Sequence, residues 1–148
     1  IIEAGIYTAF DAPFTVQTER TYIADQHERG IFHVAVHPDD GCVVGFQVVD
    51  PFVPYTAAFD HVGSIGTYVD LDRRRQGIAA ALFPATFEAA RRNGYEKLFT
   101  FVRGDNPAAL ATYLEQGFTV VGTARDQAKI DGRYIDEIII ERGLSIIR

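Results

Sequence analysis

Residues 69–79, which read Val-Asp-Leu-Asp-Arg-Arg-Arg-Gln-Gly-Ile-Ala, connect an apolar segment to the start of a helical pattern. Free backbone N–H groups and the positive end of the helix dipole gather at such a place. Gly77 lets a ligand approach the chain closely, Ala79 keeps the next position small, and the arginines supply charge that suits a phosphate. The stretch therefore predicts an anion site suited to a diphosphate. A solvated basic turn that only caps the helix is the alternative.

The hydrophobic pattern around this stretch is typical of a mixed α/β domain. We expect strands at 31–37, 42–49, 61–69, 97–102, 118–124 and 134–140. We expect helices at 3–10, from Thr15 or Thr18 to Arg29, from Gly77 to Asn93 and at 106–117. Alternation predicts that Phe32, Val34 and Val36 form the buried side of the first strand. Pro84 is expected to bend the long helix, and residues 11–13 to interrupt the first. The strand–helix–strand order over 61–102 favours a parallel crossover.

The segment 106–117 carries the clearest local signal. Asn106 suits the helix cap, Pro107 the first helical position, and Gly117 the residue after the last turn. Asn106 and Tyr113 lie nearly two turns apart, on one face and about 10 Å apart along the axis. Tyr113 can thus place its hydroxyl at the edge of a sheet, and a core tyrosine on an ordinarily capped helix is the alternative.

Composition and charge exclude several classes of protein. The 148 residues include 20 acidic and 14 Lys/Arg side chains, a net charge of −6, which argues against nucleic acid as the main partner. Their number suits one domain over 1–148. The apolar runs are too short to cross a membrane, and we expect no signal peptide. The single cysteine, Cys42, excludes a disulfide framework and a cysteine metal site. We expect a cytoplasmic protein that binds no metal. We interpret Cys42 as a small apolar residue that fills core space. The chain lacks methionine, so we expect a processed or incomplete start.

Together the two segments resemble the signatures of the GNAT superfamily of N-acetyltransferases. Arg74-Arg-Gln-Gly-Ile-Ala79 is similar to the acyl-CoA signature Arg/Gln-x-x-Gly-x-Gly/Ala, and the Asn106 helix, which carries Tyr113 and closes in Gly117-Phe118, is similar to the later one. The resemblance covers residues 31–142 and is greatest to the phosphinothricin-acetyltransferase-like branch, through 10–20 and 129–136. Two departures stand out: the family's first strand is missing before the first helix, and Ser64 occupies a position where relatives carry glutamate.

The resemblance implies a mixed, mostly antiparallel central sheet flanked by helices and open between strands 61–69 and 97–102, with acetyl-CoA in the gap. The backbone at Tyr68 and Val69 would pair with the pantetheine arm, and Asn106 would contact that arm. The Val69 N–H would stabilise the oxyanion, and Tyr113 would protonate the departing thiolate. The residues expected to bind the cofactor are Tyr68, Val69, Arg74, Arg75, Gln76, Gly77, Ile78, Ala79, Asn106 and Tyr113.

The acceptor implied by the resemblance is the primary amine of a small molecule, an amino-acid-like one included. Two alternatives stay open: a protein lysine or N-terminal acetyltransferase, with the loop 50–60 as a lid over a peptide groove, and an acyl-CoA sensor without chemistry. No base is singled out. The candidates are Glu19, His33, Asp60 and His61, and each has a plain surface interpretation. A homodimer is one possible state, with Ile138, Ile139 and Ile140 as a candidate surface.

Overall fold

A computed structural model describes residues 1–10 and 12–144, so Asp11 of the predicted break lies outside the described residues. The helical elements are η1 (Ile2–Ala4), α1 (Val16–Ala24), η2 (Ala57–Phe59), η3 (Leu71–Arg73), α2 (Ile78–Arg92) and α3 (Pro107–Glu115). The strands are β1 (Ile31–Val36), β2 (Val43–Pro51), β3 (Val62–Val69), β4 (Lys97–Arg103), β5 (Thr119–Ile130) and β6 (Arg133–Gly143).

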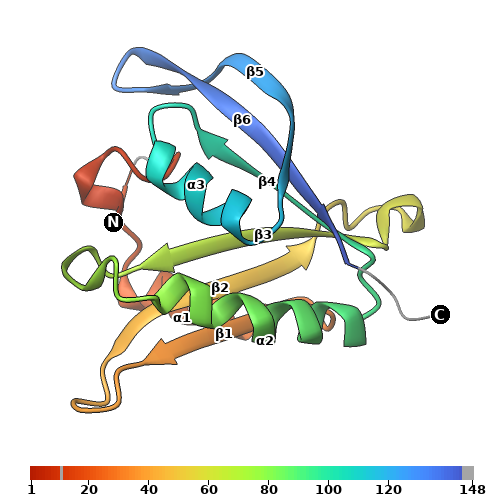
Figure 1. The fold of residues 1–148 in the computed structure, drawn as a ribbon, viewed down its shortest axis with the longest axis horizontal. Coiled ribbons are helices and arrows are strands. Elements are labelled where there is room, and N and C mark those ends of the chain that lie inside the picture. The colour runs from red at the N-terminus through yellow and green to blue at the C-terminus, as the bar shows by residue number, and fades with distance from the viewer. Residues whose placement is uncertain (11, 145–148) are drawn as a thin grey trace.

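The strands form a mixed sheet in the order β1-β2-β3-β4-β6-β5. All neighbours are antiparallel except β3 and β4, as the predicted crossover requires. β3 and β4 pair only over Val62–Ser64 and Lys97–Phe99. Beyond Ser64 the two strands diverge, and Figure 1 shows the resulting V between them. The mostly antiparallel sheet with an opening at this point is therefore confirmed.

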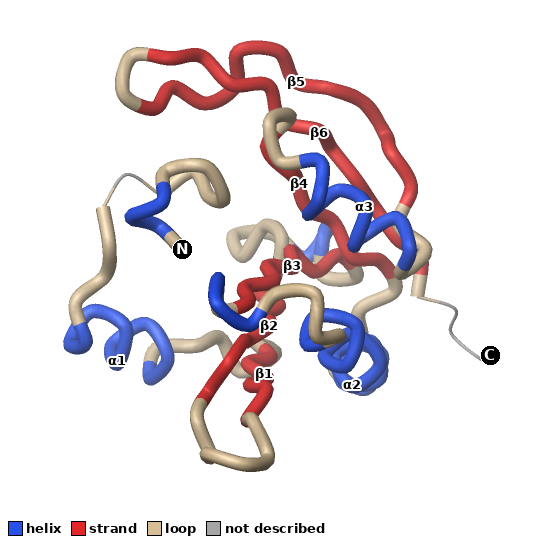
Figure 2. The backbone as a smooth tube through the Cα atoms, turned by 60° about the vertical axis from the view of Figure 1, so that its left-hand side comes forward, coloured by secondary structure: helices blue, strands red, loops and turns tan. Residues whose placement is uncertain are grey.

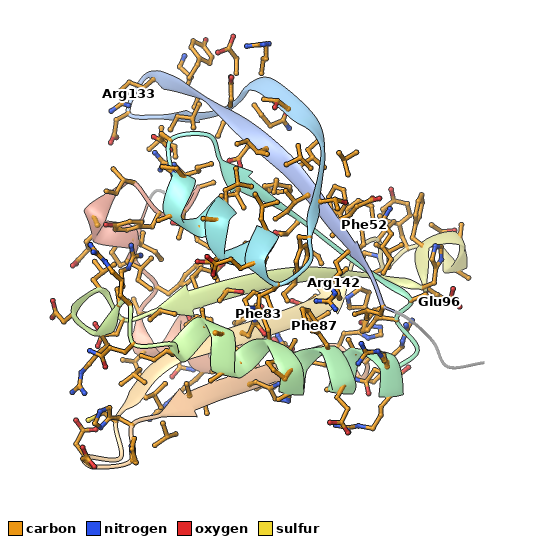
Figure 3. All side chains as sticks on the ribbon, in the orientation of Figure 1. Phe52, Phe83, Phe87, Glu96, Arg133 and Arg142 are labelled. Carbon is orange, nitrogen blue, oxygen red and sulfur yellow. The ribbon has the colours of Figure 1, made fainter. Side chains whose placement is uncertain are left out.

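Helices cover both faces of the sheet. α2 and α3 lie on one side, whereas α1 and the N-terminal segment lie on the other (Figure 2). The apolar stripe of α2 buries Phe83 and Phe87, whose rings lie 5.4 Å apart and project toward the sheet and α3 (Figure 3). Replacing such a buried phenylalanine by alanine costs about 3–5 kcal/mol. Pro84 lies on the exposed side of α2, and the helix continues through it.

The predicted buried side of β1 holds for Phe32, which is half-buried and stacks on Phe46, and is wrong for Val34 and Val36. Ile31 is buried and His33 contacts α2, where its Nδ1 lies 3.0 Å from Thr86 Oγ1. Val34 and Val36 are instead 49% and 53% exposed on the opposite face. Alternation shows which residues share a face, but the positions of the flanking helices decide which residues on each face are covered.

The N-terminal helices are shorter than predicted. The expected helix at 3–10 is only the η1 turn, because Gly5 adopts a left-handed φ of 69° directly after it. α1 begins after Thr15, whose side chain accepts from the Thr18 N–H, and ends at Ala24 rather than at Arg29. Arg29 instead reaches across to the backbone oxygens of Asn93 and Asp60.

The last two strands are longer than predicted. Asp131 and Gly132 connect them with φ of 50° and 77°. Two successive positive φ angles define the tight type I′ turn of a β-hairpin. The hairpin therefore extends well past the predicted ends at 124 and 140.

The structure also bears on three expectations about surfaces, of which the one for Cys42 is wrong. Cys42 is exposed at the β1–β2 turn and fills no core space. Ile138 to Ile140 lie on β6, an interior strand of the sheet, and Ile140 is fully buried. The loop 50–60 lies at the closed end of the V, where Phe52 packs on Phe59 and Phe99 with ring centroids 5.9 and 4.9 Å apart. A lid role for this loop has no support, because none of its residues lines either cavity described below.

Candidate active site

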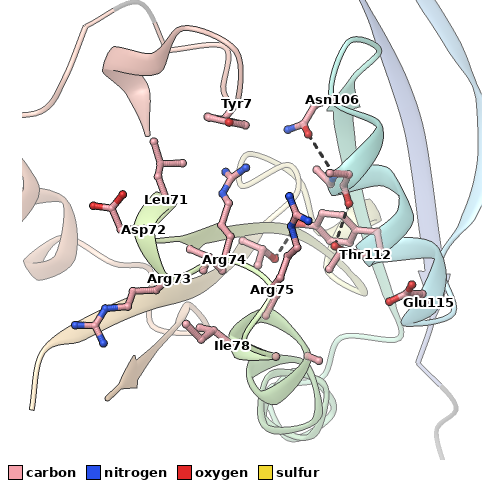
Figure 4. Close-up of a pocket in the computed structure, with 18 residues that line it drawn as sticks. Tyr7, Leu71, Asp72, Arg73, Arg74, Arg75, Ile78, Asn106, Thr112 and Glu115 are labelled. Carbon is pink, nitrogen blue, oxygen red and sulfur yellow. Dashed lines mark hydrogen bonds between the residues drawn. The ribbon is translucent and has the colours of Figure 1, made fainter. Parts of the chain in front are cut away.

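A cavity of about 700 Å³ lies where β3 has separated from β4. We call it the α2–α3 cavity, because the start of α2 and one side of α3 line it (Figure 4). The end of β3, the connection through η3 and the N-terminal segment at Tyr7 complete its wall. Segments that are distant in the sequence therefore meet at the open end of the V.

The edge of β3 faces this cavity. The Asp70 N–H donates to the Val44 carbonyl on β2 at 2.9 Å. Because backbone groups of successive strand residues point to alternate sides, the N–H groups of Val69 and Thr67 point away from β2, into the opening. β4 pairs with β3 only as far as Ser64, so the edge at Val69 can accept an added extended group.

The start of α2 offers backbone donors to the same cavity. Gly77 is the N-cap with φ 77°, and it makes no side-chain capping bond. A Cβ built at Gly77 would meet no atom within 4 Å, so open space surrounds this turn. Arg75 also has a positive φ, of 56°. The first turn of α2 thus presents N–H groups to an anion without a capping side chain in the way.

The three arginines before Gly77 differ in their surroundings. Arg74 lies over the ring of Tyr7, with its Cζ 3.8 Å from the ring centroid. Arg73 points away from Arg74 and Arg75 (Figure 4) and donates to Asp40 Oδ2 at 2.8 Å. The Cys42 N–H bond and then the Arg73 contact lower the pKa of Asp40 to about 2. Arg74 and Arg75 therefore supply the cationic side chains nearest the cavity interior.

Tyr113 reaches this cavity from α3 and is 7% exposed. Its hydroxyl donates to Thr67 Oγ1 at 2.9 Å, and Gln47 Nε2 donates to the same oxygen at 2.9 Å. Burial raises the pKa of the Tyr113 phenol well above its ordinary value near 10, against the opposing effect of the Thr67 bond. The phenol thus stays protonated across the physiological range.

Asn106 caps α3 as expected. Its Oδ1 accepts from the Ala109 N–H at 3.2 Å, and the side chain lies at the wall of the cavity. The bond uses the amide oxygen and leaves the NH₂ group as a donor at the cavity wall. Of the residues expected to bind the cofactor, those that line the cavity are Val69, Arg74, Arg75, Gly77, Ile78, Ala79, Asn106 and Tyr113.

Tyr68 and Gln76 are not among the lining residues of the α2–α3 cavity. Tyr68 pairs with Phe46 on β2, and its ring stacks on the Phe46 ring at 4.7 Å on the opposite face of the sheet. Sequence reasoning missed Thr67 and Tyr7. The i, i+2 relation of Thr67 to Val69 on a strand would have found the first, whereas no local signal marks Tyr7.

A second cavity of about 750 Å³ lies on that opposite face. We call it the aromatic cavity, because rings from the sheet, from α1 and from the segment before α1 line it. Phe32, Phe46 and Tyr68 form a stack, with successive ring centroids 5.2 and 4.7 Å apart. Burial and then the charge of Glu19 raise the pKa of Tyr68, which places that carboxylate near the stack.

The candidates for the base occupy different places. Glu19 lines the aromatic cavity. Asp60 and His61 precede β3 at its far end, roughly 25 Å or more from Val69 at the rise of a strand. Asp60 contacts Arg29 there, with 3.9 Å between Oδ1 and Nη1. His33 is partly buried against α2 through Thr86 rather than facing solvent. The structure therefore brings only Glu19 of the four to a cavity.

The open strand edge and the uncapped helix start meet at one cavity, which is the arrangement that the two sequence signatures imply for an acyltransferase. A profile described as the Acetyltransferase (GNAT) family matches residues 4–118. The chain belongs to the GNAT acetyltransferase family, as the two signatures implied.

Individual relatives support the phosphinothricin-acetyltransferase-like branch. The chain is 32% identical over 106 residues to the L-amino acid N-acetyltransferase AaaT of Escherichia coli, covering 70% of this chain and 63% of that protein. It is 26% identical to the phosphinothricin N-acetyltransferase of Streptomyces coelicolor, covering 89% of this chain and 78% of the relative. A crystal structure of a putative phosphinothricin N-acetyltransferase shares the fold, with a TM-score of 0.87, 24% identity and coverage of 98% and 87% of the two chains.

The described residues contain neither a membrane-spanning helix nor a metal-binding cluster. Within 1–10 and 12–144, no helix has the length and apolar character needed to cross a bilayer. The same residues contain no group of three or more His, Cys, Asp or Glu side chains placed to hold a metal ion.

Proposed function

We propose that this protein transfers an acetyl group from acetyl-CoA to the primary amine of a small molecule. The observation that carries the proposal is the convergence of three groups on the α2–α3 cavity: the Val69 edge, the start of α2 at Gly77 and the buried Tyr113 hydroxyl. Each suits a different part of acetyl-CoA, and together they fit its extended, anionic shape.

Different groups along the α2–α3 cavity would bind different parts of acetyl-CoA. The N–H groups of the first turn of α2 and the side chains of Arg74 and Arg75 would hold the diphosphate. The outward N–H and C=O groups of β3 near Val69 would pair with the amides of the pantetheine arm as an added strand. Asn106 would donate its amide to that arm from α3.

The acetyl transfer itself would take place at the inner end of the α2–α3 cavity. Bound acetyl-CoA supplies a thioester carbonyl that a neutral amine attacks, so that a C–N bond forms as the C–S bond breaks. The Val69 N–H would donate to the carbonyl oxygen as negative charge develops there. Tyr113, kept protonated by its burial, would give its proton to the departing sulfur.

The amine must lose a proton before or during the attack. Glu19 lines the aromatic cavity beside Tyr68, the neighbour of Val69 in the chain. This carboxylate is our candidate for accepting that proton, directly or through water.

A thiol-release assay with acetyl-CoA and a panel of primary amines tests the proposal. We expect amine-dependent CoA release together with the N-acetylated product by mass spectrometry. Tight binding of CoA without release for any amine would contradict the transferase proposal and favour an acyl-CoA sensor.

A further inference from the structure

The two cavities flank the same short segment of β3. Val69 and Thr67 line the α2–α3 cavity, whereas their neighbour Tyr68 lines the aromatic cavity. Because successive strand side chains point to opposite faces, the strand end is the wall between the two cavities. A molecule in the aromatic cavity would therefore approach the edge of β3 at Val69 from the face opposite to α2 and α3.

The walls of the aromatic cavity suit an apolar body. Phe46, Tyr68, Phe10 and Phe14 contribute aromatic rings, and Val48 contributes an aliphatic side chain. The rings of Phe10 and Phe14 lie 5.1 Å apart, edge to face, so they close one side as a packed pair. Aromatic faces carry partial negative charge, which favours an apolar group and also a cation.

The charged side chains that line this cavity are all acidic. Glu3 and Glu19 line it, and none of the lysine, arginine and histidine side chains that the structure describes does. Behind the wall, the hydroxyl of Tyr22 donates to Asp50 Oδ2 at 3.1 Å, which adds a third carboxylate nearby. Burial and then Asp50 raise the pKa of Tyr22 to about 12, so this phenol stays neutral. The cavity thus offers carboxylates to an ammonium group, and its described lining side chains include no cation to pair with a carboxylate.

We propose that the aromatic cavity is the acceptor site and that it selects a primary amine on an apolar or aromatic body that lacks a carboxylate. The proposal rests on the proposed function. It departs from the amino-acid acceptor in the name of the Escherichia coli relative. Glu19 attracts the ammonium group, and the same carboxylate repels an acidic acceptor.

A matched pair of acceptors tests this selectivity on the unaltered protein. 2-Phenylethylamine and L-phenylalanine share the ring and the amine and differ by one carboxylate. We expect kcat/KM to be higher for 2-phenylethylamine by roughly tenfold or more, since like charges placed together in a site are strongly unfavourable. Equal values, or a preference for L-phenylalanine, would overturn the proposal. A preference for ethanolamine over 2-phenylethylamine would overturn the proposal that the site selects an amine on an apolar or aromatic body.

Variants connect the selectivity to Glu19. Glu19→Gln should narrow the ratio of kcat/KM between the two acceptors by about threefold or more, whereas Glu28→Gln, an exposed residue outside both cavities, should leave it unchanged. An unchanged ratio in Glu19→Gln would contradict the role of this carboxylate. If Glu19→Gln abolishes turnover, calorimetric titration of the CoA-bound variant with each amine gives the same comparison without chemistry.

The outcomes separate the two proposals. No N-acetylated product from any amine would contradict the transferase itself. Efficient acetylation of L-phenylalanine would leave the transferase standing and overturn only the selectivity.

Discussion

The hydroxyl oxygen of Tyr113 lies 2.9 Å from Thr67 Oγ1, two residues before Val69 on the open edge of β3. The same oxygen of Thr67 accepts from Gln47 Nε2, whose side chain is fully buried. β2 thus fixes Thr67, and Thr67 fixes the phenol of α3. The proposed acid and the proposed carbonyl donor are in this way tied to one strand.

Replacing Tyr113 by phenylalanine removes the proposed acid and keeps the ring. We expect kcat to fall by about 10²–10⁴-fold. The packing of the ring against Phe83 and Phe118, with centroids 5.5 and 5.0 Å away, should keep the fold. Steady-state kinetics and a CoA titration check this. An unchanged kcat would remove Tyr113 from the chemistry.

Replacing Thr67 by valine keeps the shape and removes the oxygen that two buried donors share. Because Tyr113 and Gln47 both lose a partner, we expect the free energy of unfolding to fall by about 1–3 kcal/mol. Thr67→Ser keeps the oxygen and serves as the control. Urea unfolding of both variants measures the difference, and a Thr67→Val variant as stable as Thr67→Ser would show that the shared bond contributes nothing.

Gly77 and Gly41 provide a matched test of the anion site. Their φ angles are 77° and 68°, and an added Cβ meets no atom within 4 Å at either. Alanine costs similar backbone strain at both, about 1–2 kcal/mol. We expect only Gly77→Ala to weaken CoA binding, by roughly tenfold, because its methyl group protrudes where the diphosphate would lie. Calorimetry with CoA checks this, and equal losses in both variants would contradict the site.

The raised pKa of Tyr113 predicts the alkaline behaviour of the enzyme. An acid that must be protonated fails only above its pKa, so kcat should show no loss from Tyr113 up to about pH 10, the ordinary tyrosine value. The stabilising contribution of the neutral phenol is fully present below that unfolded pKa and is lost as pH rises through the higher folded pKa. Urea unfolding at pH 8 to 11 should show wild type losing stability above pH 10 relative to Tyr113→Phe. If the stability of wild type and of Tyr113→Phe changed with pH in the same way, the raised pKa of Tyr113 would be contradicted.

Local signals in the sequence predicted much of the fold. The Asn106 cap, the Pro107 start and the α2 stripe are short-range features, and all three hold. The Asp131-Gly132 pair is an equally local hairpin signal that would have extended β5 and β6. The face of β1 was beyond reach, because nothing local says that α2 packs over His33 rather than over Phe32.

The residues of the site also divide into those that local sequence signals predict and those that they do not. The residues around Gly77 and Tyr113 could be predicted because each lies in a contiguous motif. Tyr7 could not, since Arg103 brings its segment to the site from far along the chain: Arg103 Nη1 donates to the backbone oxygens of Gly5 and Thr8, both at 2.9 Å. The aromatic cavity likewise depends on how α1 docks against the sheet, which no motif encodes.

A crystal structure of the complex with acetyl-CoA tests the central claim most directly. We predict the diphosphate at the N–H groups of residues 75–79 and the sulfur within hydrogen-bond reach of the Tyr113 hydroxyl, at about 3.5 Å. A coenzyme bound away from Gly77, or in the aromatic cavity, would contradict the account.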